Sequence, residues 1–223
     1  MLLEDLEDYQ LWNKYKHHRL WFNKLYLAEQ LEYYCGPCGT APSISDSYVV
    51  RPIYNLAGMG LGASVKYITA KDRSATPPGY FWCQYFSGNH YSVSYSWNQD
   101  SWVPLHAWIG YNDKDNLTKF TSWIRITENI PVVPKLLNCL SDVGAINIEF
   151  KDNKIIEVHL RASGNPDGSS HSLYNEYIPV WSSDNENMIS DYVAQNYIFI
   201  NDDCDMSDVE PYSTERRIGF LVR

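Results

Sequence analysis

The sequence predicts an α+β fold in which antiparallel strands dominate. Helical periodicity is concentrated in the first 34 residues, whereas most of the chain from residue 48 onward consists of short strand-like segments separated by turns. Trp, Tyr and Phe make up 15% of the 223 residues, and aromatic side chains favour strands. This length suits one large domain or two small ones, with a sizeable hydrophobic core.

The composition excludes several classes of protein. With 44% hydrophobic and 20% charged residues, the chain is neither disordered nor fibrous. A formal net charge of −9 argues against non-specific binding to nucleic acid or to an anionic membrane, but it leaves room for a local basic site. The acidic N-terminus lacks a signal-peptide pattern, and no apolar run approaches the roughly 20 residues of a membrane helix. We therefore expect a cytoplasmic protein with no membrane or nucleic-acid partner and with reduced cysteines.

The first 34 residues predict a helical arm. Apolar residues recur at spacings of three and four over 2–12 and again over 21–31, with a polar interruption between them. This pattern fits either one long bent helix or two short ones. We expect residues 1–45 to form a helical arm and loop that dock on a main domain, residues 46–223.

Two features of this arm resemble functional sites, and we interpret both as structural. Cys35-Gly-Pro-Cys38 matches the redox motif of thioredoxins, whose reactive thiol lies at a helix N-terminus. Here the motif follows a helical pattern and leads into loop chemistry, and no second CxxC completes a zinc site. We therefore expect residues 35–42 to be a loop with two inert thiols. His17 and His18 lie in a basic stretch that we interpret as a solvated face rather than a ligand pair.

Short predicted strands follow from residue 48 onward. They cover 48–53, 64–69, 79–86, 91–97, 145–150, 155–161 and 218–222. A short helix is predicted over 134–140, where proline is acceptable in the first turn. No internal repeat is present, and the turn-linked order of the strands favours antiparallel pairing.

The hairpin at 145–161 presents two rows of side chains, because successive residues of a strand point to opposite faces. The apolar row contains Ile146, Ile148 and Phe150 on the first strand, and Ile156, Val158 and Leu160 on the second. The polar row contains Asn147, Glu149, Glu157, His159 and Arg161. Such a set suits Mg²⁺ together with an anionic ligand, although a solvated sheet face with a Glu–Arg pair would give the same pattern.

A glycine-rich turn points to the same chemistry. Gly58, Gly60 and Gly62 lie between two strands, so the turn is neither a Walker loop nor a Rossmann fingerprint, both of which lead into a helix. Such a hairpin can instead cover the phosphates of a nucleotide with backbone N–H groups, and Arg51 on the preceding strand could reach them. A bulged hairpin also uses glycines, but with the acidic hairpin the turn favours a Mg·ATP site between two sheets.

The order of these segments resembles the ATP-grasp superfamily. The matching segments are Val50-Arg-Pro, Gly58-Met-Gly-Leu-Gly, Trp82-Cys-Gln-Tyr-Phe, Ile146-Asn-Ile-Glu and Ile156-Glu-Val-His-Leu-Arg. The resemblance implies two mainly antiparallel sheets that clasp a nucleotide cleft. We expect the N-terminal helical arm beside them and no separate domain before them, whereas typical members of the superfamily have such a domain.

A narrower resemblance is to small uncharacterised ATP-grasp-like proteins of tailed bacteriophages. It rests on Trp21-Phe-Asn-Lys-Leu, on the segment from Val50 to Gly60 and on Glu157-Val-His-Leu-Arg. If the protein is phage-encoded, its compartment would be the cytoplasm of the bacterial host.

The superfamily resemblance implies a role for each candidate residue. The nucleotide-binding residues would be Arg51, Gly58, Met59, Gly60, Gly62, Gln84, Tyr85, Phe86 and His90. The metal ligands would be Asn147, Glu149, Glu157 and His159, with Glu157 bridging Mg²⁺ ions. Arg51 and Arg161 would be catalytic, on the α/β-phosphates and on the γ-phosphate or acyl phosphate respectively. His159 stands where the superfamily has Asn.

The resemblance also implies a reaction. ATP-grasp enzymes join a carboxylate to an amine or a thiol through an acyl phosphate, with ATP and Mg²⁺. We therefore expect a ligase of unknown substrate. The alternatives are a non-catalytic nucleotide-binding or protein-interaction module of phage origin, and a phage factor with no nucleotide at all. Replacing Glu157 by Gln is expected to change stability little or to raise it, because neighbouring carboxylates repel each other without a metal.

Overall fold

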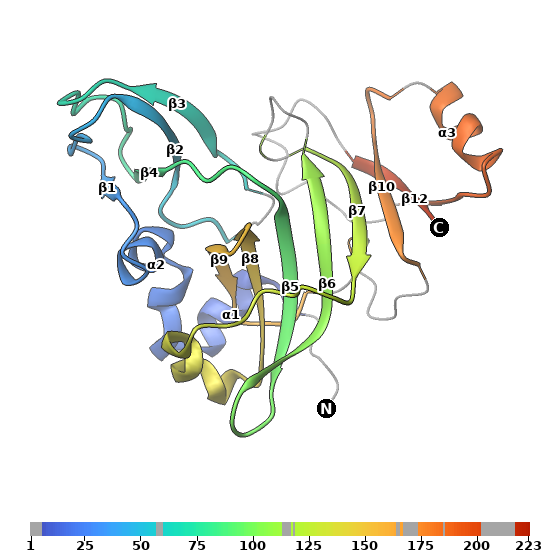
Figure 1. The fold of residues 1–223 in the computed structure, drawn as a ribbon, viewed down its shortest axis with the longest axis horizontal. Helices are drawn as coiled ribbons and strands as arrows, with labels where there is room; N and C mark the ends of the chain where they lie inside the picture. The colour runs from blue at the N-terminus through green and yellow to red at the C-terminus, as the bar shows by residue number, and fades with distance from the viewer. Residues whose placement is uncertain are drawn as a thin grey trace.

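The computed structural model describes residues 6–56, 60–112, 117, 119–163, 166, 174–184, 186–201 and 217–223. Gly58 and Met59, two of the expected nucleotide-binding residues, lie outside the described residues. The described part is an α+β fold with two antiparallel sheets, as expected from the sequence (Figure 1).

The smaller sheet has four strands in the order β1-β4-β2-β3. Its strands are β1 (Cys35–Pro37), β2 (Asp46–Pro52), β3 (Ser64–Ile68) and β4 (Tyr80–Gln84). The hairpin of β2 and β3 therefore carries the glycine-rich turn at one end of this sheet.

The larger sheet has eight strands in the order β11-β12-β10-β7-β6-β5-β8-β9. Its strands are β5 (His90–Trp97), β6 (Trp102–Asn112), β7 (Phe120–Ile126), β8 (Ala145–Lys151), β9 (Lys154–His159), β10 (Glu176–Trp181), β11 (Ile198–Asn201) and β12 (Arg217–Val222). The acidic hairpin β8–β9 thus forms the edge of the sheet that lies nearest to the N-terminal helices (Figure 1).

The N-terminal arm consists of three short helices, not of one or two. They are α1 (Asp8–Lys14), the 3₁₀ helix η1 (Lys16–Phe22) and α2 (Lys24–Gln30). The breaks fall at Tyr15 and Asn23, whose ψ angles of 62° and 105° are not helical. Asn23 also caps α2, because its side chain accepts a hydrogen bond from the backbone of Tyr26. Two further helices are η2 (Lys135–Val143) and α3 (Glu186–Val193), and none of the helices in the described ranges is long and apolar enough to cross a membrane.

Helix α2 packs against both sheets. Leu27 belongs to the main hydrophobic cluster, together with Ile148 of β8 and Val158 of β9. Ala28 packs instead with Phe81 and Cys83 of β4 in the smaller sheet. The arm therefore brings its polar side chains to the junction of the two sheets, while the division between residues 1–45 and 46–223 stays a prediction.

Residues 35–37 form an edge strand, so the expected loop over 35–42 is wrong at its start. Cys35 pairs with Cys83 and Pro37 with Phe81, and an edge strand tolerates proline. Burial raises the pKa of Cys35 to about 11 and that of its strand partner Cys83 to about 12, while the inertness of the two thiols Cys35 and Cys38 stays a prediction. A redox-active cysteine would need the opposite shift.

Four strands of the larger sheet, β6, β7, β10 and β11, are absent from the sequence-based assignment. The clearest case is β6, a central strand with Pro104 in its interior. Proline within a run normally argues against a central strand. A bulge explains the exception, because the pairing of β5 and β6 shifts between Ser94 and Tyr95, next to Pro104.

Candidate functional site

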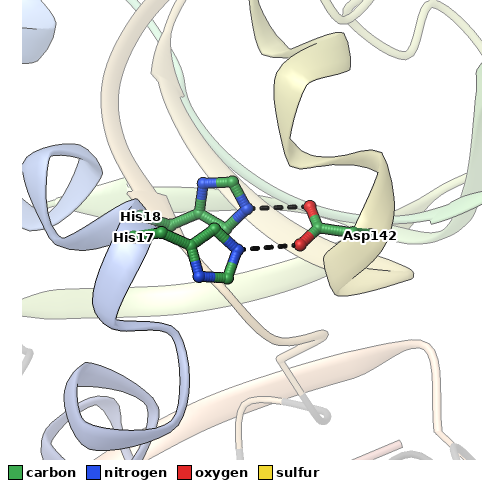
Figure 2. Close-up of side chains that lie close together, drawn as sticks. All are labelled: His17, His18 and Asp142. Atoms are coloured by element: carbon green, nitrogen blue, oxygen red, sulfur yellow. Dashed lines mark hydrogen bonds and ion pairs between the residues drawn. The ribbon is translucent and has the colours of Figure 1, made fainter.

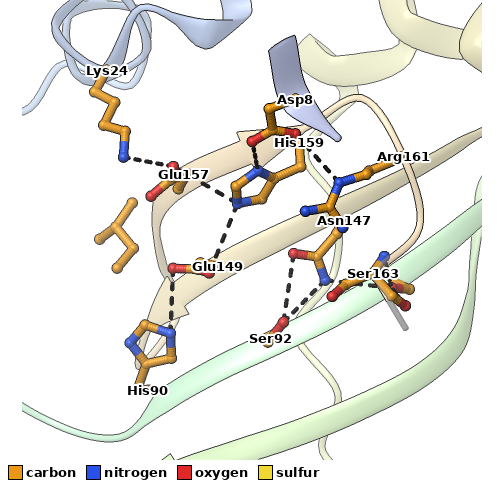
Figure 3. Close-up of polar contacts among 12 residues, drawn as sticks. Asp8, Lys24, His90, Ser92, Asn147, Glu149, Glu157, His159, Arg161 and Ser163 are labelled. Carbon is orange, nitrogen blue, oxygen red and sulfur yellow. Dashed lines mark hydrogen bonds and ion pairs between the residues drawn. The ribbon is translucent and has the colours of Figure 1, made fainter. Parts of the chain in front are cut away.

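The hairpin of β8 and β9 places the predicted polar row on one face. Asn147 pairs with His159, and Glu149 pairs with Glu157. The His159 Nε2 atom lies 3.8 Å from Glu149 Oε1 and 3.7 Å from Glu157 Oε1 (Figure 3). The expectation that these four side chains share a face is confirmed, whereas their role as metal ligands stays a prediction.

The apolar row differs from the expected one in its second strand. A bulge lies between Glu149 and Phe150, so that Phe150 pairs with Ile155 and not with Ile156. Ile155, rather than Ile156, joins the main core with Val158. Strict alternation fails here because the bulge inserts one residue into β9, and the displaced Ile156 lines the cleft between the sheets.

Two charged residues of the N-terminal arm complete the cluster. Lys24 of α2 places its Nζ 2.5 Å from Glu157 Oε1, with both side chains buried. Asp8 of α1 places Oδ2 2.6 Å from His159 Nδ1 and Oδ1 3.4 Å from Arg161 Nε (Figure 3). Neither residue was a candidate from the sequence, because nothing in the local pattern of the arm indicates a partner more than 100 residues away.

These contacts set the charge of each group. Burial by itself would lower the pKa of His159, but the carboxylate of Asp8, with smaller effects from Glu149 and Glu157, raises it to about 10. Burial would raise the pKa of Glu149, but contacts from His159 and His90 bring it well below its usual value. The pKa of Asp8 is lowered, because the charge and hydrogen bond of His159 outweigh burial. At neutral pH the cluster therefore contains the imidazolium of His159 beside the carboxylates of Asp8 and Glu149.

This charge arrangement predicts a pH-dependent stability. The pKa of His159 is raised from its ordinary value of 6.5 to about 10, so its contribution is fully present below pH 6.5 and is lost as the pH rises toward 10. The free energy of unfolding therefore falls as the pH rises through that window. We expect urea unfolding between pH 6.5 and 10 to show this extra slope in the wild type but not in His159→Gln. Parallel stability curves for the two proteins would contradict the assignment.

A cleft between the two sheets collects most of the predicted nucleotide-binding residues. The predicted residues that line it are Arg51, Gly60, Gln84, Tyr85, Phe86, His90, Glu149 and Glu157. Lys24 and Lys151 also line it. Gly62 lies in the same turn, with a φ of +77° that favours glycine, whereas Asn147, His159 and Arg161 are not part of the cleft wall.

Arg51 joins the two sheets across this cleft. Its Nη2 atom donates a 2.8 Å hydrogen bond to the carbonyl oxygen of Ile156 in β9. Its Nε atom is buried without a hydrogen-bond partner, and a buried unpaired donor is costly. The Nε2 atom of His90 is likewise buried without a hydrogen bond, 3.4 Å from Glu149 Oε2. Unsatisfied nitrogen atoms at a cleft suit an anionic ligand.

The segment from Gln84 to Phe86 forms another part of the cleft wall. The side-chain Oε1 atom of Gln84 accepts a 2.8 Å hydrogen bond from the backbone of Tyr34, which also accepts one from the Gln84 N–H. Phe86 packs edge-on against Tyr33, with ring centroids 4.8 Å apart. Since the Gln84 side chain has an internal partner, the backbone and rings of this segment are the groups best placed to face a base.

Solved structures share this arrangement of sheets and helices. The ADP complex of PurK, an N5-carboxyaminoimidazole ribonucleotide synthetase, superimposes with a TM-score of 0.58 at 10% identity, over 98% of this chain and 74% of the enzyme. The N5-carboxyaminoimidazole synthetase from Staphylococcus aureus complexed with ADP gives a TM-score of 0.56 at 11% identity, over 93% of this chain and 68% of that one. The chain has an ATP-grasp fold.

The ATP-grasp likeness is one of structure alone. No family model matches the sequence, and no curated protein is similar to it in sequence. The chain spans only 42% of the length of an L-amino acid ligase from Bacillus licheniformis, which matches with a TM-score of 0.46 at 15% identity over 66% of this chain. The resemblance to ATP-grasp proteins is confirmed for the fold, while that to phage proteins stays a prediction.

Proposed function

We propose that the protein is a Mg·ATP-dependent ligase that joins a carboxylate to an amine or a thiol. The observation that supports this most is the cleft of the ATP-grasp fold, where Arg51, the turn at Gly60, the segment 84–86 and the acidic pair Glu149 and Glu157 converge. In this assignment the base lies against segment 84–86. The triphosphate runs beneath the glycine-rich turn toward the carboxylates.

The residues around the cleft fit a triphosphate. Arg51 provides a guanidinium with an unpaired Nε, and Lys151 and Lys24 add two ammonium groups. Charge-assisted hydrogen bonds from such groups to phosphate are among the strongest in proteins. In the proposed reaction the substrate carboxylate attacks the γ-phosphorus, ADP leaves, and the amine or thiol then displaces phosphate from the acyl phosphate. The protein's own part is to orient the reactants and to balance their charge.

The carboxylates also fit Mg²⁺. Glu149 and Glu157 are paired across two strands, and Mg²⁺ is typically held by one or two carboxylates together with phosphate oxygens. A bound Mg²⁺ would supply charge neutralisation to the phosphates. Lys24 holds Glu157 in this structure. Metal binding by Glu157 would therefore require Lys24 to give up that contact, while Glu149 is half-buried and faces the cleft. We propose Glu149 as the principal ligand, with Glu157 and Asn147 as secondary ones.

Arg161 is proposed to clamp the γ-phosphate or the acyl phosphate. It follows β9 and faces Asp8 at 3.4 Å, with its Nε buried and without a hydrogen bond. His159 contacts Asp8 and both glutamates, and its pKa is raised to about 10. We therefore assign it to positioning the carboxylates rather than to ligating a metal.

A second candidate is a nucleotide-binding module without ligase chemistry. One observation favours it: Lys24 and Asp8 of the chain itself already pair with Glu157, His159 and Arg161. A site whose charges are internally balanced needs no metal in order to be stable. A protein-interaction role of phage origin belongs to the same alternative.

The two functions are separated by an assay of ADP and phosphate release. The protein is incubated with Mg·ATP and mixed amino acids, and a ligase should release both products only when a carboxylate and an amine are present. A titration of ATP into the protein is followed by calorimetry in parallel. Binding without turnover would favour the second candidate, and no binding at all would leave only the protein-interaction role.

Arg51→Met is expected to weaken ATP binding by about 10-fold or more, because a hydrogen bond to a charged group contributes about 1.5–3 kcal/mol. The change keeps an unbranched stem but removes the guanidinium and its charge. The matched control is Arg73→Met, since Arg73 is exposed and does not line the cleft. Calorimetric titration with Mg·ATP measures both variants. Equal affinities for Arg51→Met and the wild type would remove Arg51 from the site.

A further inference from the structure

A second polar cluster lies apart from the cleft, where η1 meets η2 (Figure 2). His17 and His18 are neighbours in η1, and Asp142 lies in η2. The Nε2 atom of His17 is 3.0 Å from Asp142 Oδ2, and the Nε2 atom of His18 is 2.7 Å from Asp142 Oδ1. One ligand atom from each residue lies within 4.8 Å of the other two.

The interpretation of His17 and His18 as a solvated face holds for the exposed His17 but is wrong for the buried His18. The side chain of His18 is only 11% exposed, whereas those of His17 and Asp142 are 64% and 52% exposed. Both rings point toward one carboxylate that comes from a segment 124 residues later than His18 (Figure 2). The sequence of the arm holds no signal for this partner.

The geometry is that of a chelating set. Neighbouring side chains on a helix usually point apart, but here the two imidazole rings lie 4.0 Å apart and aim their Nε2 atoms at the same carboxylate. Zinc–ligand bonds of about 2.0–2.1 Å place adjacent ligands of a tetrahedral site about 3.3 Å apart. The two nitrogen–oxygen distances, 3.0 and 2.7 Å, are hydrogen bonds to the two oxygens of one carboxylate, so small movements of the side chains would reach that spacing.

The chemistry of the three donor groups is also suitable. Two imidazoles and one carboxylate favour zinc and similar transition-metal dications over Mg²⁺, which prefers oxygen ligands alone.

We propose that His17, His18 and Asp142 form a binding site for a zinc-class divalent cation. The ligand atoms are Nε2 of each histidine and one carboxylate oxygen. A neutral ring moves its proton from Nε2 to Nδ1 as the metal binds, and a protonated ring releases one proton to water. Three protein ligands leave a fourth position for water, and the exposure of His17 and Asp142 makes that position accessible.

The cation would join the N-terminal arm to η2. The same arm carries Asp8 and Lys24 into the cluster beneath β8 and β9, so metal binding would stabilise the docked form of the arm. A ligand that binds only the folded state raises the melting temperature, and the rise grows with the logarithm of the ligand concentration above its Kd. The site therefore gives two independent readouts, the binding of the metal and the shift in melting temperature.

The test uses the full chain without a histidine tag, in a reducing buffer that contains excess Mg²⁺. Co²⁺ is titrated and followed by its visible absorption, and Zn²⁺ affinity is measured by competition with a chromophoric chelator. We expect one equivalent to bind to the wild type, and Zn²⁺ to raise its melting temperature. His17→Ala removes an exposed ligand, so the variant should fold normally but bind at least about tenfold more weakly, with a smaller thermal shift.

Cys139→Ser is the matched control, because Cys139 is an exposed thiol in η2 close to Asp142. Binding that survives in Cys139→Ser and falls in His17→Ala and in Asp142→Asn supports the proposal. No binding by the wild type, or equal binding by His17→Ala and the wild type, would overturn it. Loss of binding in Cys139→Ser with retention in His17→Ala would assign the metal to a thiol instead and would also overturn it.

Discussion

Glu149→Gln is expected to lower Mg·ATP-dependent turnover by about 10²–10³-fold, the usual cost of removing one preorganised electrostatic contact. Contacts with His159 and His90 lower the pKa of Glu149. Glu149 and Glu157 both line the cleft. Among the described ion pairs, Glu157 contacts Lys24, whereas Glu149 contacts only histidines. The glutamine keeps the size and shape of the side chain but removes the charge that balances the cation. Release of ADP at saturating Mg·ATP is the measurement.

The control for this prediction is Glu128→Gln, an exposed glutamate that does not line the cleft. The affinity for ATP should rise with Mg²⁺ in the wild type and in Glu128→Gln, but not in Glu149→Gln. This second readout applies even if the protein binds ATP without turning it over. An Mg²⁺ response in Glu149→Gln equal to that of the wild type would show that the metal lies elsewhere.

Asp8→Asn is expected to lower the free energy of unfolding by about 3–5 kcal/mol, because breaking one side of a buried ion pair leaves its partner charge uncompensated. Asp8 is 3% exposed and faces both His159 and Arg161. Asparagine retains a hydrogen-bond acceptor but no charge for either cation. Equilibrium unfolding in urea at pH 7 measures the effect.

The matched variant for this measurement is Asp100→Asn, in an exposed turn. It should change stability by less than about 0.5 kcal/mol, as surface substitutions usually do. Asp8→Asn should also lower the pKa of His159 and so flatten the stability curve between pH 6.5 and 10. A loss for Asp8→Asn no larger than that for Asp100→Asn would contradict the role of Asp8 in the cluster.

The candidate site could be predicted where its signals are local. Alternation in the hairpin at 145–161 placed Asn147, Glu149, Glu157 and His159 on one face, and their pairing in the structure agrees. Alternation could not reveal the bulge after Glu149, because the change of register depends on the partner strand. Pairings between segments far apart in sequence leave no such local pattern.

The partners of the site were missed for the same reason. Lys24 lies in a helix more than 100 residues before Glu157, yet their side chains form a buried ion pair. The expectation that Glu157→Gln changes stability little or raises it assumed that Glu157 faces only other carboxylates. Since the substitution would leave the ammonium of Lys24 buried without a charge partner, we now expect it to destabilise the fold.

The fold was predictable at the level of class and order of segments. The glycine-rich turn and the alternating strands gave two antiparallel sheets and their cleft. The central strand β6 was missed because Pro104 interrupts its strand pattern, and only its bulged pairing with β5 accommodates the proline.

The most direct test of the account is a crystal structure with Mg²⁺ and a non-hydrolysable ATP analogue. The account predicts the base against segment 84–86, the phosphates near Arg51 and the turn at Gly60, and the metal on Glu149. Nucleotide bound anywhere other than the cleft between the two sheets, or a metal on the phosphates with no contact to Glu149 or Glu157, would contradict it.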